Sequence, residues 1–138
     1  WKGFCPTHNN LKPSQVKKVK AENPDALFLA HPECTPEVLA LADEIKSTSG
    51  IIAFVKNSSH NKFIIGTENG ILHPLSKANP DKEFIPAAPD MICANMKKTM
   101  LLDIVKALEQ MKTIVKVPEE IANRARSAVE KMLAIPAG

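Results

Sequence analysis

The sequence contains no tyrosine, and only 4% of its 138 residues are aromatic. Proteins that bind single-stranded nucleic acid stack bases on aromatic side chains, so this composition argues against such a surface. The formal net charge is only +3, and the densest basic run, residues 17–20, is typical of the solvated face of a helix. We therefore expect no nucleic-acid partner.

Long apolar runs are also absent. No stretch approaches the roughly 20 apolar residues of a membrane-spanning helix, and the first residues lack the apolar core of a signal peptide. The three cysteines are an odd number, which argues against a disulfide framework and favours reduced thiols or metal ligands in a cytoplasmic protein. We expect no membrane partner. Because the sequence opens without methionine, we also expect it to be the middle of a longer chain.

What the sequence does contain is an alternation of short apolar strands and amphipathic helices. The expected strands are residues 26–30, 62–66, 83–86 and 113–117. The expected helices are residues 13–21, a helix from Thr35, residues 71–77, a helix capped by Thr99 and a helix from Pro118 with its apolar residues facing inward. This alternation predicts an α/β fold, a short and mostly parallel sheet in a three-layer αβα arrangement.

Two segments need local arguments. The helix from Thr35 has a hydroxyl cap, a proline at its first position and apolar residues at helical spacing, namely Val38, Leu41, Ala42 and Ile45. Residues 51–55 have the composition of a strand, but the hydroxyl cluster at 47–49 is typical of a helix cap, so we predict a helix there.

Polar side chains follow the predicted strands, and ligands of open α/β sheets bind at the carboxyl ends of strands. In an extended chain, His31 and Glu33 would point the same way and Cys34 the opposite way. A histidine and a carboxylate on one face can act as acid and base, or the carboxylate can fix the histidine tautomer. A strand-end histidine bonded to a backbone carbonyl is the structural alternative. Thr67 and Glu68 follow the next strand.

The cysteines and hydroxyls leave further alternatives open. Cys5 and His8, and likewise His31 and Cys34, have the spacing of metal ligands, but without a paired CxxC the spacing alone favours buried structural thiols. The hydroxyls of residues 47–49, with free N–H groups at a helix start, could bind phosphate or carboxylate, or could simply cap the helix.

Six short segments, in this order and spacing, closely resemble the C-terminal half of the quinolinate synthases, the A proteins of de novo NAD biosynthesis: GFCPTH, HPEC, STSG, IIGTENG, HPLSKANPDKEFIP and CANMKK. The resemblance covers essentially the whole sequence. It implies a transferase that condenses iminoaspartate with dihydroxyacetone phosphate, releases phosphate and water, and is functionally linked to an L-aspartate-oxidising enzyme. It also implies a 4Fe-4S cluster whose open iron acts as a Lewis acid.

The resemblance assigns residues to roles. Cys5 and Cys93 match two of the three cluster cysteines, and the third lies outside this sequence. Cys34 is not counted as a ligand, because the family tolerates other residues there. The remaining matches are His8, a histidine that faces the substrate; His31 and Glu33, a pair for proton transfer and positioning; and Ser47 and Thr48, hydroxyls for a substrate carboxylate or phosphate. Lys46 departs from the family, since many relatives have glycine there, and this leaves the geometry of that anion site open.

The family fold implied is three similar αβα domains around a pseudo-threefold axis. Residues 1–24 would end a preceding domain with the first ligand loop, 25–98 would form a complete domain, and 99–138 would form a helix–strand–helix that packs on the absent N-terminal domain. We therefore expect the chain alone to be inactive. Two other interpretations compete: a non-catalytic α/β ligand-binding domain with structural thiols, and a zinc protein that uses Cys5, Cys93 and a histidine.

Overall fold

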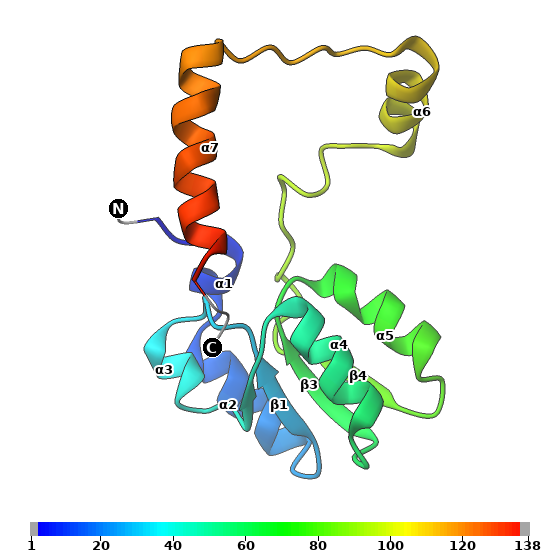
Figure 1. Ribbon diagram of the computed structural model, residues 1–138. Coiled ribbons are helices and arrows are strands. Elements are labelled where there is room, and N and C mark those ends of the chain that lie inside the picture. Colours follow the sequence, from blue (N-terminus) through cyan, green and yellow to red (C-terminus); the bar gives the residue numbers. More distant parts are fainter. Residues whose placement is uncertain (1–2, 136–138) are drawn as a thin grey trace. The chain divides into compact units, whose positions relative to one another are not determined.

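The computed structural model describes residues 3–135. The chain divides into two units, Trp1–Lys97 and Lys98–Gly138, and each is described by itself (Figure 1). Residues 1, 2 and 136–138, at the ends of the predicted segments 1–24 and 99–138, lie outside the described residues. How the whole protein divides into domains stays a prediction.

The first unit contains a parallel four-stranded sheet. Its strands are β1 (Leu27–Ala30), β2 (Glu44–Ile45), β3 (Lys62–Gly66) and β4 (Glu83–Pro86), in the order β2-β1-β3-β4. In the register of the sheet, Ala30 lies beside Ile45 on one side and Gly66 on the other. Strands β1 and β3 are continuous apolar runs because both faces of the sheet are covered.

Helices cover both faces of this sheet. They are α2 (Pro13–Glu22), α3 (Pro36–Leu39), α4 (Thr48–Asn57) and α5 (Leu72–Ala78), which follows the 3-10 turn η1 (Asn69–Ile71); the short helix α1 (Pro6–Asn10) precedes α2. Side chains of α2 and α3 pack on one face, against Phe28, Ala30 and Ile64. Side chains of α4 and α5 pack on the other face, against Leu29, Phe63 and Ile65. Figure 1 shows α4 lying across the strands of this face. The predicted three-layer αβα fold is confirmed.

The predicted long helix from Thr35 is wrong in its length. Helix α3 ends at Leu39, and Glu44–Ile45 forms the edge strand β2 instead. Asp43 explains the difference, because its N–H donates to the Phe28 carbonyl at 2.9 Å and its carboxylate accepts the Phe28 N–H at 2.7 Å. These bonds satisfy the outer edge of β1, so the chain pairs with that strand rather than continuing the helix.

Gly66 closes β3 where the sheet leaves no room for a side chain. A Cβ at this position would lie 2.7 Å from Cε2 of Phe28 and 3.2 Å from the Leu29 carbonyl oxygen. Gly66→Ala is therefore expected to lower the free energy of unfolding by about 1–3 kcal/mol, measured by urea denaturation. Gly50→Ala, in the first turn of α4, meets only side-chain atoms of residues 46 and 47 and should have a smaller effect. Equal losses would contradict this packing argument.

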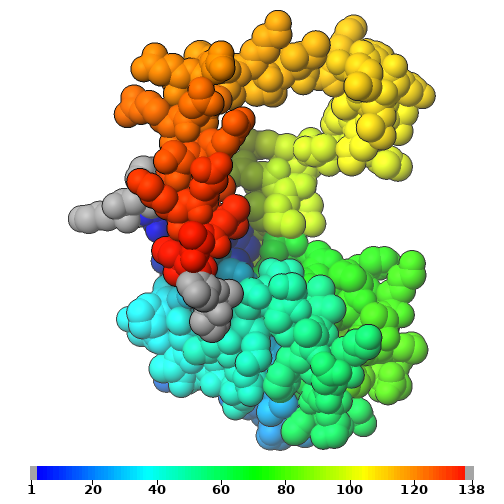
Figure 2. Space-filling model, in the orientation of Figure 1, coloured from blue at the N-terminus to red at the C-terminus, as the bar shows by residue number. Residues whose placement is uncertain are grey.

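The second unit consists of α6 (Leu101–Gln110) and α7 (Glu119–Leu133), and neither helix buries a residue among those described. The predicted strand 113–117 is wrong: these residues have no regular secondary structure and form a single thread of chain (Figure 2). A strand needs a paired neighbour, and the described part of this unit offers none. None of the described helices is long and apolar enough to cross a membrane.

The first residue of α6 and the exposure of the apolar residues of α7 also differ from the sequence prediction. Met100, not Thr99, is the N-cap of α6, and its N–H donates to the Asp103 carboxylate at 2.9 Å. Helix α7 begins after Pro118, as predicted. The residues expected to face inward from α7 are instead exposed, namely Ile121, Ala125, Ala128, Val129 and Met132.

Candidate functional site

The candidate site lies at the carboxyl edge of the sheet, where three neighbouring strands end. The His31 N–H donates to the Gly66 carbonyl at 3.1 Å, and the Lys46 N–H donates to the Ala30 carbonyl at 3.0 Å. His31, Ser47 and Thr67 therefore leave adjacent strands at the same edge. From β1 the chain proceeds to β2 on one side and then to β3 on the other, so this edge is the topological switch point at which α/β folds bind ligands.

Residues 31–34 form a turn rather than the extended chain assumed from the sequence. The Cys34 N–H donates to the His31 carbonyl at 3.0 Å. The predicted side-chain directions are nevertheless found. His31 Nδ1 lies 3.6 Å from the Glu33 carboxylate, whereas Cys34 points into the core and is only 5% exposed.

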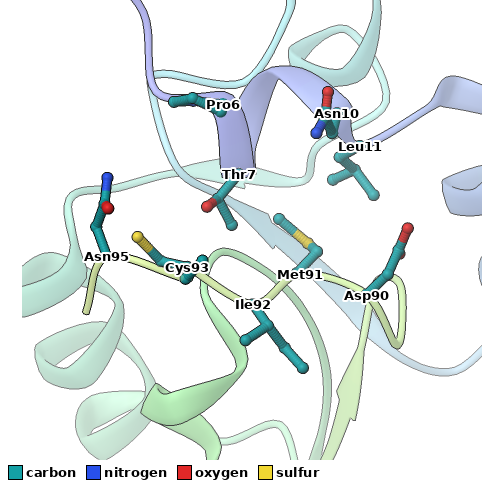
Figure 3. Close-up of a pocket in the computed structure, with 10 residues that line it drawn as sticks. Pro6, Thr7, Asn10, Leu11, Asp90, Met91, Ile92, Cys93 and Asn95 are labelled. Atoms are coloured by element: carbon teal, nitrogen blue, oxygen red, sulfur yellow. The ribbon is translucent and has the colours of Figure 1, made fainter. Parts of the chain in front are cut away.

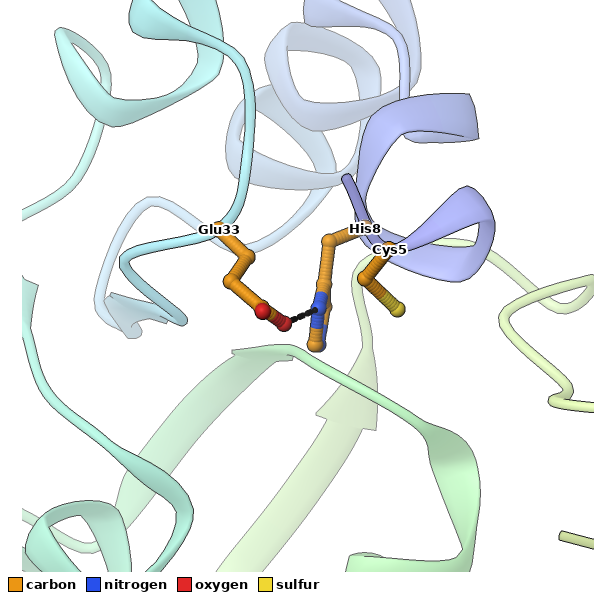
Figure 4. A group of neighbouring side chains, drawn as sticks. All are labelled: Cys5, His8 and Glu33. Carbon is orange, nitrogen blue, oxygen red and sulfur yellow. Dashed lines mark hydrogen bonds and ion pairs between the residues drawn. The ribbon is translucent and has the colours of Figure 1, made fainter. Parts of the chain in front are cut away.

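His8 is held at both ring nitrogens, and Figure 4 shows its bond to Glu33. Nδ1 lies 2.9 Å from a Glu33 carboxylate oxygen, and Nε2 lies 2.9 Å from the Thr67 hydroxyl. Because a carboxylate only accepts hydrogen bonds, Nδ1 carries a proton; in the uncharged form of the ring Nε2 accepts from Thr67. The His8 residue is 7% exposed. Glu33 and Thr67 thus fix both the orientation and the tautomer of His8.

His31 stacks on His8, with ring centroids 4.2 Å apart and an angle of 5° between the planes. Its Nδ1 accepts the Glu33 N–H at 3.2 Å, so the ring proton lies on Nε2, and the short approach to the Glu33 carboxylate is not an ion pair. Burial, followed by the charge of His8, lowers the pKa of His31 against the opposing effect of Glu33. His31 is therefore a neutral imidazole at pH 7, and its Nε2–H has no partner among the described residues.

Cys93 lies on the loop after β4, beside α1. The backbone of Met96, as the largest cause, lowers the pKa of the Cys93 thiol. The backbone of Asn95 and the side chain of Thr7 act on this pKa in the same direction and outweigh the opposing effects of burial and of Glu68. A cavity of about 320 Å³ opens between α1 and this loop, with Cys93 and Thr7 on its wall (Figure 3). Cys93 thus has the partly exposed position and the hydrogen bonds of a reactive or metal-binding thiolate.

The other two cysteines differ sharply from each other. Cys5 is the half-buried N-cap residue of α1. Its Sγ, a ring nitrogen of His8 and a carboxylate oxygen of Glu33 all lie within 4.8 Å of one another, so these three could hold a metal ion. Burial raises the pKa of Cys34 to about 11, which disfavours the thiolate that metals bind.

Ser47 and Thr48 begin α4, which confirms the helix predicted there. The Ser47 hydroxyl accepts the Gly50 N–H at 3.3 Å, so it caps the helix, and both side chains are exposed. The Lys46 ammonium is bound by Glu44 at 2.9 Å and lies over the Phe54 ring. Any anion at this helix start would therefore be held by hydroxyls and N–H groups rather than by Lys46.

Sequence reasoning missed α1 and the residues that support the site. Pro6 at a first helical position, after Cys5, is a signal that could have indicated α1. The sequence indicates Thr67 only by its place after a strand, and its contact with His8, 59 residues away, has no sequence signature.

Comparison with known proteins agrees with this architecture. A sequence model of the quinolinate synthetase A protein family matches residues 1–134. Quinolinate synthase of Geotalea uraniireducens is 55% identical over 136 residues, which is 99% of this chain and 45% of that protein. The quinolinate synthases of Thermodesulfovibrio yellowstonii and Methanoregula boonei are 49% and 48% identical over 135 residues, which is 98% of this chain and 45% of each relative. The chain thus spans somewhat less than half the length of these relatives, and it belongs to the quinolinate synthase family.

Proposed function

We propose that this chain supplies one part of the active site of a quinolinate synthase, which condenses iminoaspartate with dihydroxyacetone phosphate to give quinolinate for NAD biosynthesis. The observation that carries the proposal is the convergence of His8, His31 and Glu33 at the switch point of the sheet, with Cys5 beside them. Proton-transfer groups and a soft ligand at one strand edge suit a condensation followed by dehydration. We also propose that the protein acts in the cytoplasm, with supply of its substrate by an L-aspartate-oxidising enzyme.

Cys5 and Cys93 suit an iron–sulfur cluster, with a third cysteine from outside this chain. Both thiols are free and partly exposed. The backbones of Asn95 and Met96 lower the pKa of the Cys93 thiol, and hydrogen bonding to sulfur tunes cluster thiolates. When bound, the cluster would supply a Lewis-acidic iron for substrate oxygens.

The proton chemistry falls to the histidines and the carboxylate. His31 presents Nε2–H, which can donate to a substrate oxygen or nitrogen. Glu33 shares one oxygen with His8 and is exposed enough to exchange a proton with a substrate. His8 holds that carboxylate in place with its own Nδ1–H, while Ser47 and Thr48 at the start of α4 would bind a substrate carboxylate or phosphate.

The test compares the chain alone with a chimera in which this chain replaces the matching part of the Geotalea uraniireducens relative. After anaerobic reconstitution with iron and sulfide, the chimera should form quinolinate from the two substrates, and the chain alone should form none, because a complete site needs the third cysteine and further pocket residues. Activity of the isolated chain would overturn the first expectation. A folded chimera that binds iron but lacks activity would overturn the proposed function.

A mononuclear zinc site is the second candidate, because ligand atoms of Cys5, His8 and Glu33 already lie within 4.8 Å of one another. Both ring nitrogens of His8 already have a hydrogen-bond partner. Zinc bound to Nδ1 would displace Glu33 Oε2, and zinc bound to Nε2 would displace the Thr67 hydroxyl. Metal analysis of the anaerobically purified chimera separates the two, since a brown, iron-containing protein excludes the zinc assignment and stoichiometric zinc excludes the cluster.

A further inference from the structure

We propose that Glu68 is a positioning residue that fixes the loop of Cys93, so that this thiol is presented at the site before any cluster binds. The proposal rests on the proposed function only in treating Cys93 as a ligand. Glu68 directly follows Thr67, just after the end of β3. Only 9% of the surface of Glu68 is exposed. A carboxylate so far from water is costly unless hydrogen-bond donors surround it.

The donors come from two segments that the carboxylate joins. One oxygen accepts the Gly70 N–H at 2.7 Å, in the turn after β3. The other oxygen accepts the Cys93 N–H at 3.4 Å and the Lys97 ammonium at 3.2 Å. The Lys97 N–H in turn donates to the Cys93 carbonyl at 3.3 Å. Both ends of the loop 93–97 are thus tied to a single side chain on the sheet.

The hydrogen bonds show that Glu68 is held as a carboxylate. Its partial burial alone would raise the pKa, but the bonds from Gly70, Lys97 and Cys93 outweigh burial and lower the pKa below its ordinary value. Thr67 and Glu68 therefore divide the support of the site between them. Thr67 holds His8 on α1, and Glu68 holds the loop of Cys93.

Gly70 leaves room for this arrangement. A Cβ at residue 70 would lie 2.6 Å from Glu68 Oε2 and 3.2 Å from Lys97 Nζ. Gly70→Ala would therefore push the carboxylate off the loop without removing any of its partners. It provides a second variant that does not depend on deleting a buried charge.

The first test measures amide hydrogen exchange in the metal-free chain, for Glu68→Gln and Gly70→Ala. A glutamine cannot accept on both sides, so one donor loses its partner. Exchange at Cys93 and its neighbours should rise about tenfold or more in both variants through local opening. Asp43→Asn is the matched control, since Asp43 also accepts one backbone N–H and one lysine, at β1. Unchanged exchange at Cys93 in either folded variant, or an equal rise in the control, would overturn the proposal.

The second test measures the rate at which a chelator removes iron from the chimera. Both variants should lose iron at least about tenfold faster than the unmodified chimera, as expected when outer contacts of a ligand are lost. The Asp43→Asn chimera should lose iron at the unmodified rate. Equal rates would overturn the positioning role. If the unmodified chimera holds no iron, the proposed function fails, and the exchange result on the metal-free chain still decides whether Glu68 fixes the loop.

Discussion

Replacing Glu33 by glutamine is expected to lower the turnover of the chimera by about 10²-fold or more and to leave its iron content unchanged. A glutamine oxygen can still accept the His8 Nδ1–H that now binds the carboxylate at 2.9 Å. The geometry is therefore kept, while the negative charge and the ability to take a proton are lost. Initial rates of quinolinate formation and iron analysis of the same preparation measure the two quantities.

Glu37→Gln serves as the control, because it removes the same charge four residues later, from the exposed first turn of α3. Its turnover should stay close to that of the unmodified protein. A second readout follows His31 by NMR titration in the chain. The charge of Glu33 raises the pKa of His31, although burial and His8 keep it below the ordinary value of 6.5. Glu33→Gln should therefore lower that pKa further. Unchanged turnover, or a raised His31 pKa, would contradict the assigned role of Glu33.

The fold could be predicted where the chain carries strong local signals. The apolar runs of β1 and β3, and the cap and hydroxyl cluster before α4, gave the right elements because both depend on nearby residues. The strand β2 could not be predicted, since only two residues pair and the pairing depends on Asp43 meeting Phe28, 15 residues earlier. The segment 113–117 has the composition of a strand, but strands form only with a partner.

The sequence predicts which residues of the candidate site lie at strand ends, but it does not predict the contacts that hold them in place. The rule that ligands gather at carboxyl edges selected His31, Glu33, Thr67 and Glu68 from the sequence. It could not tell that His8 would be clamped between two of them, because the contacts span 25 and 59 residues. The orientation of Cys34 was right for a partly wrong reason: a turn, rather than an extended strand, directs it into the core.

The substitution Cys93→Ser is expected to abolish cluster binding, whereas Cys34→Ser is expected to preserve it. Loss of a ligand should weaken binding by more than the roughly 10–100-fold that follows loss of an outer hydrogen bond. Cys34 is buried, its Sγ lies 3.5 Å from the Gly66 carbonyl, and its raised pKa disfavours the thiolate. Visible absorbance, iron content and quinolinate formation of Cys93→Ser and Cys34→Ser chimeras, reconstituted in parallel, measure the difference.

Stability provides the control that separates the two thiols. Cys34→Ser places a hydroxyl in an apolar core cluster, so it should lower the free energy of unfolding by about 1–3 kcal/mol, whereas Cys93→Ser, in a partly exposed loop, should change it little in the metal-free chain. The pair of variants therefore predicts opposite outcomes: one protein that binds iron but unfolds earlier, and one that stays folded but binds none. Loss of iron in Cys34→Ser, at a temperature where it is folded, would refute the exclusion of Cys34 from the ligands, and retention of iron in Cys93→Ser would refute the assignment to Cys93.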